Sequence, residues 1–356
     1  MVGAGIAGLA VARVLADRGA VVEVVERTPE PDPGGAGIFL TGNAVRALRA
    51  LGLEGDAMGR AVPIGAQRVT DGAGRALYQV ATDELWHGIA PTLATSRATL
   101  RTAMLEQVDD VPIRWATQPV AVETRPGAGV EVALDDDTTG RYDLVVGADG
   151  VHSTVRRMLF GDVGVRDTGI HAWRLLAPRG ELGPVWSARL GRGSTFLEVP
   201  VSEDEAYCYV DVAAEHAGDG LAGVGGRFQG AVPQLGTGRL VHSGRLSEVV
   251  LPRWSVGNVV LVGDAAHATR PNMAQGAAMA LEDAVVLADV LGTAPSVPDA
   301  LRTWELRRRP RVERVQRQSA ARDRTRTMSP AVRDLMLRAV GRRMFRANYR
   351  GLHEEP

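Results

Sequence analysis

Short apolar runs without polar alternation recur along the chain and predict strands that are buried on both faces. The clearest lies at residues 258–262, and further strands are predicted at residues 20–25, which include Glu23, and at residues 141–147, whose apolar part begins at Leu144. Stretches rich in helix formers are interspersed with them, at residues 9–18, 95–105 and 275–291. Buried strands that alternate with helices predict an α/β fold with a parallel sheet.

Two other regions alternate apolar and polar positions, which is typical of strands with one exposed face. One spans residues 62–79 around the turn signal Asp71-Gly72, and the other spans residues 164–248. We expect them to form a second domain, a sheet over which a substrate could lie. The predicted units are a discontinuous domain at 1–62, 90–165 and 250–295, the sheet domain at 63–89 and 166–249, and a helical C-terminal segment at 296–356.

The chain opens on the spacing G-x-G-x-x-G, with Gly3, Gly5 and Gly8 ahead of a predicted helix. Gly3 permits a tight turn, Gly5 lets the backbone approach a pyrophosphate, and Gly8 allows close packing of helix and sheet. Glu26 ends the next strand, 18 residues after Gly8, where a carboxylate can accept both hydroxyls of an adenosine ribose. This combination predicts a Rossmann-like dinucleotide-binding domain.

The strand that normally precedes this motif is short here. It usually has about 5–6 residues, whereas only Met1 and Val2 precede Gly3. Because that strand lies in the middle of the sheet, its loss would leave unpaired backbone groups on its neighbours. We therefore expect the natural reading frame to begin a few codons upstream, or the chain to be truncated.

The segment that follows the strand at 258–262 is suited to an anion. Gly263-Asp264 ends the strand, and a new helix begins at Gln275. The first N–H groups of a helix have no internal acceptor and carry the positive end of its dipole. They therefore suit an anion or an electron-rich carbonyl.

Three other positions have local interpretations. Asn43 is a natural N-cap for a helix at 43–52. Asp149 ends a buried strand, where it is either a ligand-binding carboxylate or part of a plain Asp-Gly turn. Arg97 lies in the first turn of its helix, where it is either solvated or held for an anion.

The composition limits the chemistry. The 356-residue chain has a formal net charge of −1 and a pI of about 6.7, so nothing overall invites nucleic acid or an anionic membrane. It contains no lysine, which removes every mechanism that needs a lysine amine. The arginine-rich stretch at 302–326 is interleaved with acidic residues, and we expect a solvated, ion-paired helix face.

The single cysteine, Cys208, excludes an intrachain disulfide and a thiolate metal cluster, and we expect a buried thiol. No apolar run reaches the ~18 residues of a membrane span. We expect a soluble protein of the reducing cytoplasm, without a metal site.

Three motifs follow one another along the chain: Gly3, Gly5 and Gly8 with Glu26, then Gly147, Asp149 and Gly150, then Gly263-Asp264 with Pro271 and Gln275-Gly276. Their succession resembles the FAD-dependent aromatic hydroxylases of the p-hydroxybenzoate hydroxylase type. Within that family it is most similar to the branch of salicylate and urate hydroxylases and zeaxanthin epoxidase. The resemblance covers the chain from residue 1 to about residue 320.

The resemblance implies a non-covalently bound FAD. Its pyrophosphate would be held by Gly3, Gly5, Ala7 and Gly8, and its adenosine ribose by Glu26 with Arg27 beside it. Arg97 resembles the family arginine that reaches the FAD, which favours the anion-binding interpretation. Val120 resembles a position that meets the adenine side through its backbone.

The resemblance also assigns the flavin end of the cofactor. Asp149 and Gly150 would lie between FAD and a transient nicotinamide site. The ribityl and pyrophosphate region would meet Gly263, Asp264 and Pro271, and the flavin N1–C2=O edge would meet backbone N–H groups of Gln275, Gly276 and Ala277. His267 is expected to be packed beside this loop rather than to act as an acid or base. Ala274 and Ala278 replace the Gly and Asn that are frequent in the family, so their methyl groups restrict the flavin's approach.

The activity implied is that of a single-component monooxygenase. NAD(P)H would reduce the FAD, and O2 would form a flavin hydroperoxide that hydroxylates or epoxidises a small aromatic or polyene substrate. No residue can be chosen for proton transfer, and we expect a monomer or homodimer. The alternatives are a reductase or oxidase of the same fold, and a non-catalytic FAD-binding protein that is degenerate or truncated at its N-terminus. A halogenase is disfavoured because that family relies on a lysine.

Overall fold

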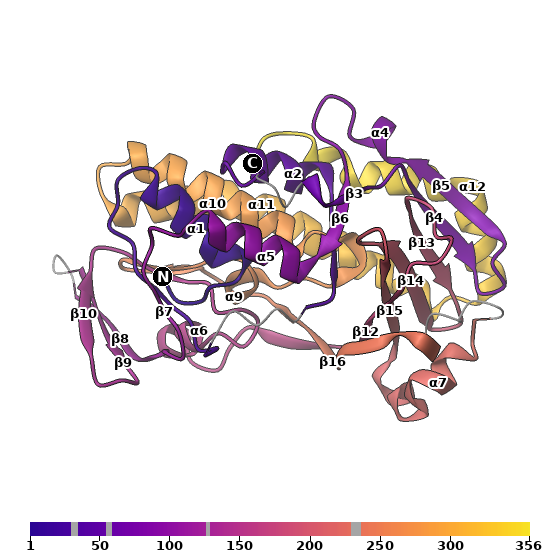
Figure 1. The fold of residues 1–356 in the computed structure, drawn as a ribbon, viewed down its shortest axis with the longest axis horizontal. Helices are drawn as coiled ribbons and strands as arrows, with labels where there is room; N and C mark the ends of the chain where they lie inside the picture. Colours follow the sequence, from indigo (N-terminus) through magenta and orange to yellow (C-terminus); the bar gives the residue numbers. More distant parts are fainter. Residues whose placement is uncertain (30–34, 55–58, 126–128, 229–235) are drawn as a thin grey trace.

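The computed structural model describes residues 1–29, 35–54, 59–125, 129–228 and 236–356. It shows a mixed α/β protein with several sheets and a helical C-terminus, which confirms the predicted fold class (Figure 1). The parallel strands lie toward one end of the long axis, and a seven-stranded sheet lies toward the other. None of the described helices is both long and apolar enough to cross a membrane.

The buried apolar runs form one sheet. Its neighbours in order are β7 (Ile113–Arg114), β1 (Val24–Val25), Val2, β11 (Val145–Gly147), β18 (Val259–Leu261) and β17 (Ser255–Val256). Val2 makes parallel bridges to Val25 and to Gly147, so the residues ahead of Gly3 take the middle of the sheet. β17 runs antiparallel to β18. The expectation of upstream codons stays a prediction.

Helices α1 (Ile6–Ala16), α5 (Arg97–Glu106) and α10 (Gly276–Thr293) share the largest hydrophobic core with these strands (Figure 1). α1 and α10 pack against each other, and small residues make this possible. Gly263 is the second residue after the end of β18. A Cβ added to it would lie 2.9 Å from the Cβ of Ala7 and 3.3 Å from that of Ala280. The remaining helices of this region are α2 (Gly42–Ala50), α6 (Thr154–Phe160) and α9 (Asp264–His267).

The alternating segments form the seven-stranded sheet. Its order is β16 (Arg239–Val249), β12 (Val165–Pro178), β15 (Glu205–Ala213), β14 (Ser194–Pro200), β13 (Val185–Leu190), β4 (Ala66–Asp71) and β5 (Ala76–Ala81). The β4–β5 hairpin confirms the turn predicted at Asp71-Gly72. One face of the sheet packs under α7 (Gly220–Gly225), with Cys208 fully buried as predicted. Burial raises the pKa of the Cys208 thiol to about 12.

Two small sheets flank these layers. One contains β2 (Gly37–Leu40), β6 (Leu93–Ser96) and β3 (Val62–Pro63), and the other contains β10 (Thr139–Tyr142), β9 (Gly129–Leu134) and β8 (Pro119–Arg125). Short helical turns complete the described chain: α4 (Thr82–Leu85), η1 (Ala214–Asp219), η2 (Pro271–Met273), η3 (Arg324–Thr327) and η4 (Arg350–Leu352). The division into domains by residue number stays a prediction.

The C-terminal segment consists mainly of α11 (Val297–Asp323) and α12 (Pro330–Tyr349). The prediction of a solvated arginine face on α11 is wrong in part, because Arg308 is fully buried and Arg311 is nearly so. Arg308 donates to Glu282 and to Asp283, each at 2.8 Å, and both carboxylates are buried on α10. Arg311 donates to both oxygens of Glu282 at 2.7 Å.

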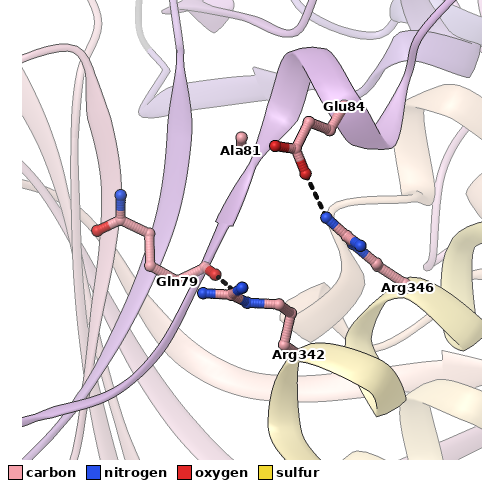
Figure 2. Close-up of a pocket in the computed structure, with 5 residues that line it drawn as sticks. All are labelled: Gln79, Ala81, Glu84, Arg342 and Arg346. Atoms are coloured by element: carbon pink, nitrogen blue, oxygen red, sulfur yellow. Dashed lines mark hydrogen bonds and ion pairs between the residues drawn. The ribbon is translucent and has the colours of Figure 1, made fainter.

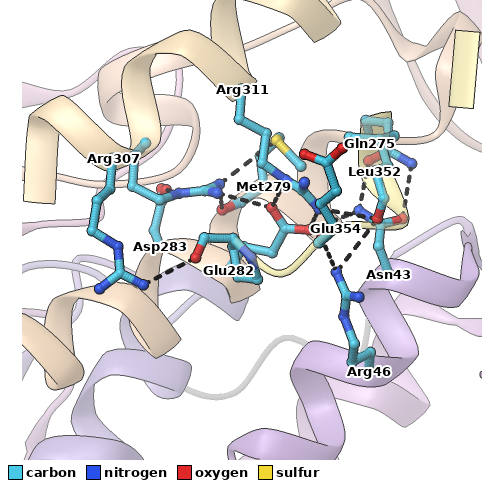
Figure 3. Close-up of polar contacts among 12 residues, drawn as sticks. Asn43, Arg46, Gln275, Met279, Glu282, Asp283, Arg307, Arg311, Leu352 and Glu354 are labelled. Carbon is cyan, nitrogen blue, oxygen red and sulfur yellow. Dashed lines mark hydrogen bonds and ion pairs between the residues drawn. The ribbon is translucent and has the colours of Figure 1, made fainter. Parts of the chain in front are cut away.

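This ion cluster continues into α2, as Figure 3 shows. Asn43 donates to Glu282 at 2.9 Å and to the side-chain oxygen of Gln275 at 3.0 Å. The prediction that Asn43 caps α2 is therefore wrong: α2 begins at Gly42 with Thr41 at the N-cap, and the Asn43 amide is used in the core. The Asn43 side chain therefore makes long-range hydrogen bonds to α10 and Gln275 instead of the local N-cap bond that the sequence predicted.

Removing the Arg308 guanidinium should destabilise the fold strongly, because two buried carboxylates lose their cation. We expect Arg308→Ala to lower the free energy of unfolding by about 3–5 kcal/mol. Arg307→Ala is the matched control, since Arg307 pairs with Asp289 at the surface and such pairs contribute about 0–1 kcal/mol. Urea unfolding of both variants measures the difference, and equal losses would contradict the prediction.

Candidate functional site

Four predicted turns lie at one edge of the parallel sheet. Gly3 follows Val2, Glu26 follows β1, Ala148 follows β11, and Gly263 comes two residues after the end of β18. Since these strands run parallel, their carboxyl ends share an edge, which is where ligands bind in open α/β sheets.

The glycines at the start of α1 have different surroundings. Gly3 has a φ of +102°, and a Cβ there would lie 2.6 Å from the carbonyl oxygen of Ala148. A Cβ on Gly8 would lie 1.9 Å from the carbonyl oxygen of Gly3. Gly5 is exposed, and an added Cβ would meet nothing within 4 Å. Gly3 and Gly8 are thus required by packing, whereas Gly5 keeps an approach to the helix open.

That approach leads to hydrogen-bond donors. Among the residues that the structure describes, none accepts a hydrogen bond from the backbone N–H of residues 5–8. These groups carry the positive end of the α1 dipole. They form a cradle of the kind that binds a pyrophosphate.

Glu26 is held beside this cradle by its neighbours. Its carboxylate accepts from the Ala4 N–H at 2.7 Å, and from the Thr28 N–H and hydroxyl at 3.0 and 2.9 Å. Burial alone would raise the pKa of Glu26, but these hydrogen bonds and the charge of Arg101 bring it below its usual value. Arg101 also donates to the Ala4 carbonyl at 3.0 Å and lies over the ring of Trp115. Two of these bonds end on Oε1 and one on Oε2, so Oε2 of the ionised Glu26 still has a lone pair for a ribose hydroxyl.

A second open helix start lies at α10. No acceptor for the backbone N–H groups of Gln275, Gly276 or Ala277 occurs in the described part of the chain. The Gln275 side chain is fully buried, where it donates to the Thr41 hydroxyl at 2.9 Å and accepts from Asn43. This anchoring fixes the first turn of α10 from inside and leaves its backbone donors available.

The turn before α10 includes Ala274, which has a φ of +52°. A left-handed conformation favours glycine, so the side chain of Ala274 strains the backbone at this turn. Pro271 begins the short turn η2 and is exposed.

Gly263 and His267 are both tied to Asp283 of α10. The Gly263 N–H donates to Asp283 at 2.9 Å, and His267 Nε2 lies 2.7 Å from the same oxygen. Burial would raise the pKa of Asp283, but His267 and Arg308 hold it below its usual value. His267 is 3% exposed, which confirms the packed histidine. Asp264 is exposed, and its Oδ1 lies 3.8 Å from where a Cβ on Gly276 would be.

Asp149 has a structural partner. Its carboxylate accepts from the N–H groups of Thr154 and Val155 at 2.6 and 3.1 Å, and from the Ser153 hydroxyl. It therefore caps α6 while lying against Gly3, where a Cβ would approach the Asp149 Cα at 3.1 Å. Gly150 beside it has a φ of +79° and open space around an added Cβ.

Three predicted residues are less closely joined to this edge. The Arg27 and Arg97 side chains are exposed, and Val120 on β8 is 55% exposed. The chain before β8 does reach Glu26, because the Thr117 N–H donates to the Glu26 carbonyl at 2.9 Å. Sequence reasoning missed the residues that hold the site from a distance, namely Thr28, Thr41, Arg101 and the core role of Asn43. They belong to no short motif that could have revealed them.

A pocket of about 300 Å3 lies away from this edge, between β5, α4 and α12. Figure 2 shows its lining by Gln79, Ala81, Glu84, Arg342 and Arg346. Arg346 pairs with Glu84, and Arg342 donates to the Gln79 carbonyl. It contains none of the motif residues. Among the described residues, no three His, Cys, Asp or Glu side chains gather as metal ligands.

Comparison with known proteins identifies the family. A family model described as an FAD binding domain matches residues 1–176 and 241–319. The chain is 36% identical to 2-heptyl-3-hydroxy-4(1H)-quinolone synthase of Pseudomonas aeruginosa, over 89% of this chain and 86% of the relative. It is 35% identical to 3-amino-4-hydroxybenzoate 2-monooxygenase of Streptomyces cremeus, over 90% and 85%.

A solved structure supports the same family. Klebsiella pneumoniae HpxO in complex with FAD and uric acid superposes with a TM-score of 0.83 at 27% identity, over 99% of this chain and 93% of that chain. The chain therefore belongs to the family of FAD-dependent aromatic hydroxylases and monooxygenases. The open donors at the starts of α1 and α10, and the free space at Gly5 and Gly150, fit its FAD cofactor.

A methyl group at Gly5 and one at Gly8 should have opposite consequences. Gly8→Ala drives a Cβ into the Gly3 carbonyl, so we expect a loss of about 1–3 kcal/mol in unfolding free energy. Gly5→Ala should stay within about 1 kcal/mol but retain less FAD after desalting, because the methyl fills the approach to the donors. Unfolding curves and flavin-to-protein ratios measure both. A Gly5→Ala protein with full flavin content would refute this assignment.

Glu26 should make stability depend on pH. Because its pKa is lower in the folded state, its ionised form stabilises the fold above the unfolded pKa of about 4.3, and this contribution is lost as the pH falls through the folded value. Glu26→Gln does not titrate. We expect the wild-type protein to exceed it in stability at pH 7 and the difference to shrink below about pH 4.3. Urea midpoints from neutral to acid pH test this, and a constant gap contradicts it.

Proposed function

We propose that this chain is a single-component monooxygenase that takes electrons from NAD(P)H and transfers one oxygen atom from O2 to a small aromatic or polyene substrate. The observation that carries the proposal is the meeting of two open helix starts, those of α1 and α10, at one edge of the parallel sheet. Bound FAD supplies electron transfer and the activation of O2. The chain supplies binding, orientation and exclusion of water.

In this proposal the α1 end binds the adenosine half of FAD. Gly3, Gly5, Ala7 and Gly8 receive the pyrophosphate, and Glu26 accepts the ribose hydroxyls. Arg27, Arg97 and Val120 keep the cofactor contacts that the family resemblance assigns to them, at the pyrophosphate and the adenine side.

The α10 end binds the flavin half. The backbone N–H groups of Gln275, Gly276 and Ala277 would hold the N1–C2=O edge of the flavin, and donors placed there would favour its reduced form. The turns with Asp149 and Gly150, and with Gly263, Asp264 and Pro271, receive the remaining flavin and ribityl contacts.

The substrate lies beyond the flavin edge, against the seven-stranded sheet. Ala274 joins a mostly apolar cluster with Phe39, Leu197, Tyr207 and Val241, which come from β2, β14, β15 and β16. An apolar wall beside the flavin excludes water from the reacting atoms, which limits wasteful release of peroxide. A cytoplasmic location and a monomeric or dimeric state complete the proposal.

Oxygen consumption tests the proposal most directly. The purified, desalted protein should show flavin absorption bands that bleach when NADPH or NADH is added without oxygen and recover when air is admitted. With a substrate, O2 uptake should match NAD(P)H oxidation and oxygenated product should form. A screen should contain aminohydroxybenzoates and alkylquinolones, the compound classes in the relatives' names.

The same experiment separates the alternatives. A reductase would consume NAD(P)H with substrate in the absence of oxygen. An oxidase would convert O2 to peroxide without an oxygenated product. A protein that never takes up FAD, even when the cofactor is supplied in excess, would overturn the proposal.

A further inference from the structure

The turn before α10 carries backbone strain. Ala274 has a φ of +52° and a ψ of +37°, a left-handed conformation that residues with a Cβ rarely adopt. Its N–H donates to the Pro271 carbonyl at 3.0 Å, which closes the short turn η2. Gln275 follows directly, so the conformation of Ala274 sets the direction of the first backbone donors of α10. Such a conformation persists only where the surroundings hold it.

One peptide bond decides the sign of the Ala274 φ. The planar peptide between Met273 and Ala274 directs its carbonyl to one side and its N–H to the other. A half-turn of this peptide would change the φ of Ala274 from +52° to about −130°, which is an ordinary value for alanine. The strain would then be relieved, and the residues on both sides would shift. A contact that holds the Met273 carbonyl therefore holds the left-handed turn.

Tyr349 of α12 makes that contact. Its hydroxyl donates to the Met273 carbonyl at 3.0 Å, and the tyrosine is only 2% exposed, so the hydrogen bond is shielded from water. Neighbouring side chains fix its ring: the ring centroid lies 4.8 Å from that of Phe345 and 5.9 Å from that of Trp86, and the Arg322 guanidinium lies 5.2 Å from it. The hydroxyl is thus held in one place by the packing of the ring.

Contacts from α11 hold the other part of the turn. Asn272 donates to the Ser319 carbonyl and to Asp323, each at 2.9 Å, and its own carbonyl accepts from Arg322 at 2.8 Å. Among the residues that the structure describes, Tyr349 is the only one whose side chain donates to the Met273 carbonyl. The α11 contacts therefore fix the start of the turn, whereas the Tyr349 hydroxyl restrains the strained peptide itself.

We propose that Tyr349 is a positioning residue, which acts on the bound flavin through this turn. By holding the Met273–Ala274 peptide, it keeps the N–H groups of residues 275–277 directed at the cofactor. Donors at the N1–C2=O edge stabilise the reduced flavin more than the oxidised flavin, so a loosened turn lowers the reduction potential. The inference rests on the proposed function, because it requires the flavin to meet the start of α10.

The reduction potential of the bound flavin tests this inference. Tyr349→Phe removes only the hydroxyl and keeps the packing of the ring. We expect its preference for reduced over oxidised FAD to fall about tenfold, which lowers the two-electron potential by about 30 mV. Equilibration of the FAD-loaded, full-length protein against a reference dye measures this potential by absorption.

Tyr78→Phe is the matched control, because it makes the same change beneath the same helix. The ring of Tyr78 also packs on Phe345, with centroids 6.0 Å apart. In the part of the chain that the structure describes, its hydroxyl makes no hydrogen bond to residues 270–274. We expect Tyr78→Phe to leave the potential unchanged.

Glycine at position 274 tests whether strain is the link. Glycine adopts the left-handed conformation readily, so the turn no longer needs the hydroxyl. We expect Ala274→Gly to recover most of the potential that Tyr349→Phe loses. The same coupling should appear without cofactor: Tyr349→Phe should lower the urea midpoint of the FAD-free protein less beside Ala274→Gly than in the wild-type background.

Each result decides between the two proposals. Equal potentials in the wild type and Tyr349→Phe, with FAD bound to both, overturn this inference and leave the proposed function standing. A potential that Tyr349→Phe lowers and Ala274→Gly does not restore also overturns it. A wild-type protein that binds no FAD refutes the proposed function, and the urea midpoints of the FAD-free proteins then decide alone whether Tyr349 holds the turn.

Discussion

The buried ion cluster around Arg308 is the constraint on which the first turn of α10 and the turn after β18 both depend. Its two carboxylates, Glu282 and Asp283, are neighbours on α10 and point to different parts of the site. Asp283 holds the Gly263 N–H at the turn after β18, and Glu282 holds Gln275 through an asparagine of α2. Because such a cluster is stable only when every charge has its partner, the two turns are fixed together rather than separately.

Packing by small residues completes this arrangement at α1. In the glycine motif before α1, two glycines are required by the packing of the fold, and one leaves space for a ligand. Gly3 and Gly8 touch backbone, whereas Gly5 faces open space. Gly263 packs between Ala7 of α1 and Ala280 of α10, so the two helices come close only because all three residues are small. The cofactor cradle is thus a consequence of helix packing as much as of helix dipoles.

Local sequence patterns predicted the helices and strands, whereas the roles of individual polar side chains depend on long-range contacts. Buried strands, the β4–β5 hairpin and the starts of α5 and α10 follow from periodicity and turn residues, which act over a few positions. Asn43 was misassigned because its partners, Gln275 and Glu282, are more than 230 residues away. Arg308 looked like a surface residue for the same reason: its sequence neighbours are charged, and only tertiary packing of α11 on α10 buries it.

The absence of lysine gives this arrangement a particular electrostatic character. Every side-chain cation other than histidine is an arginine, and a guanidinium does not lose its proton in the physiological range. The charges of Arg97, Arg101 and Arg174 are therefore constant, and they bias the groups near them, Glu26 toward its ionised form and His242 toward its neutral form. A change of pH around neutrality acts on the ligand, the cofactor and histidine, while the positive potential of the site persists.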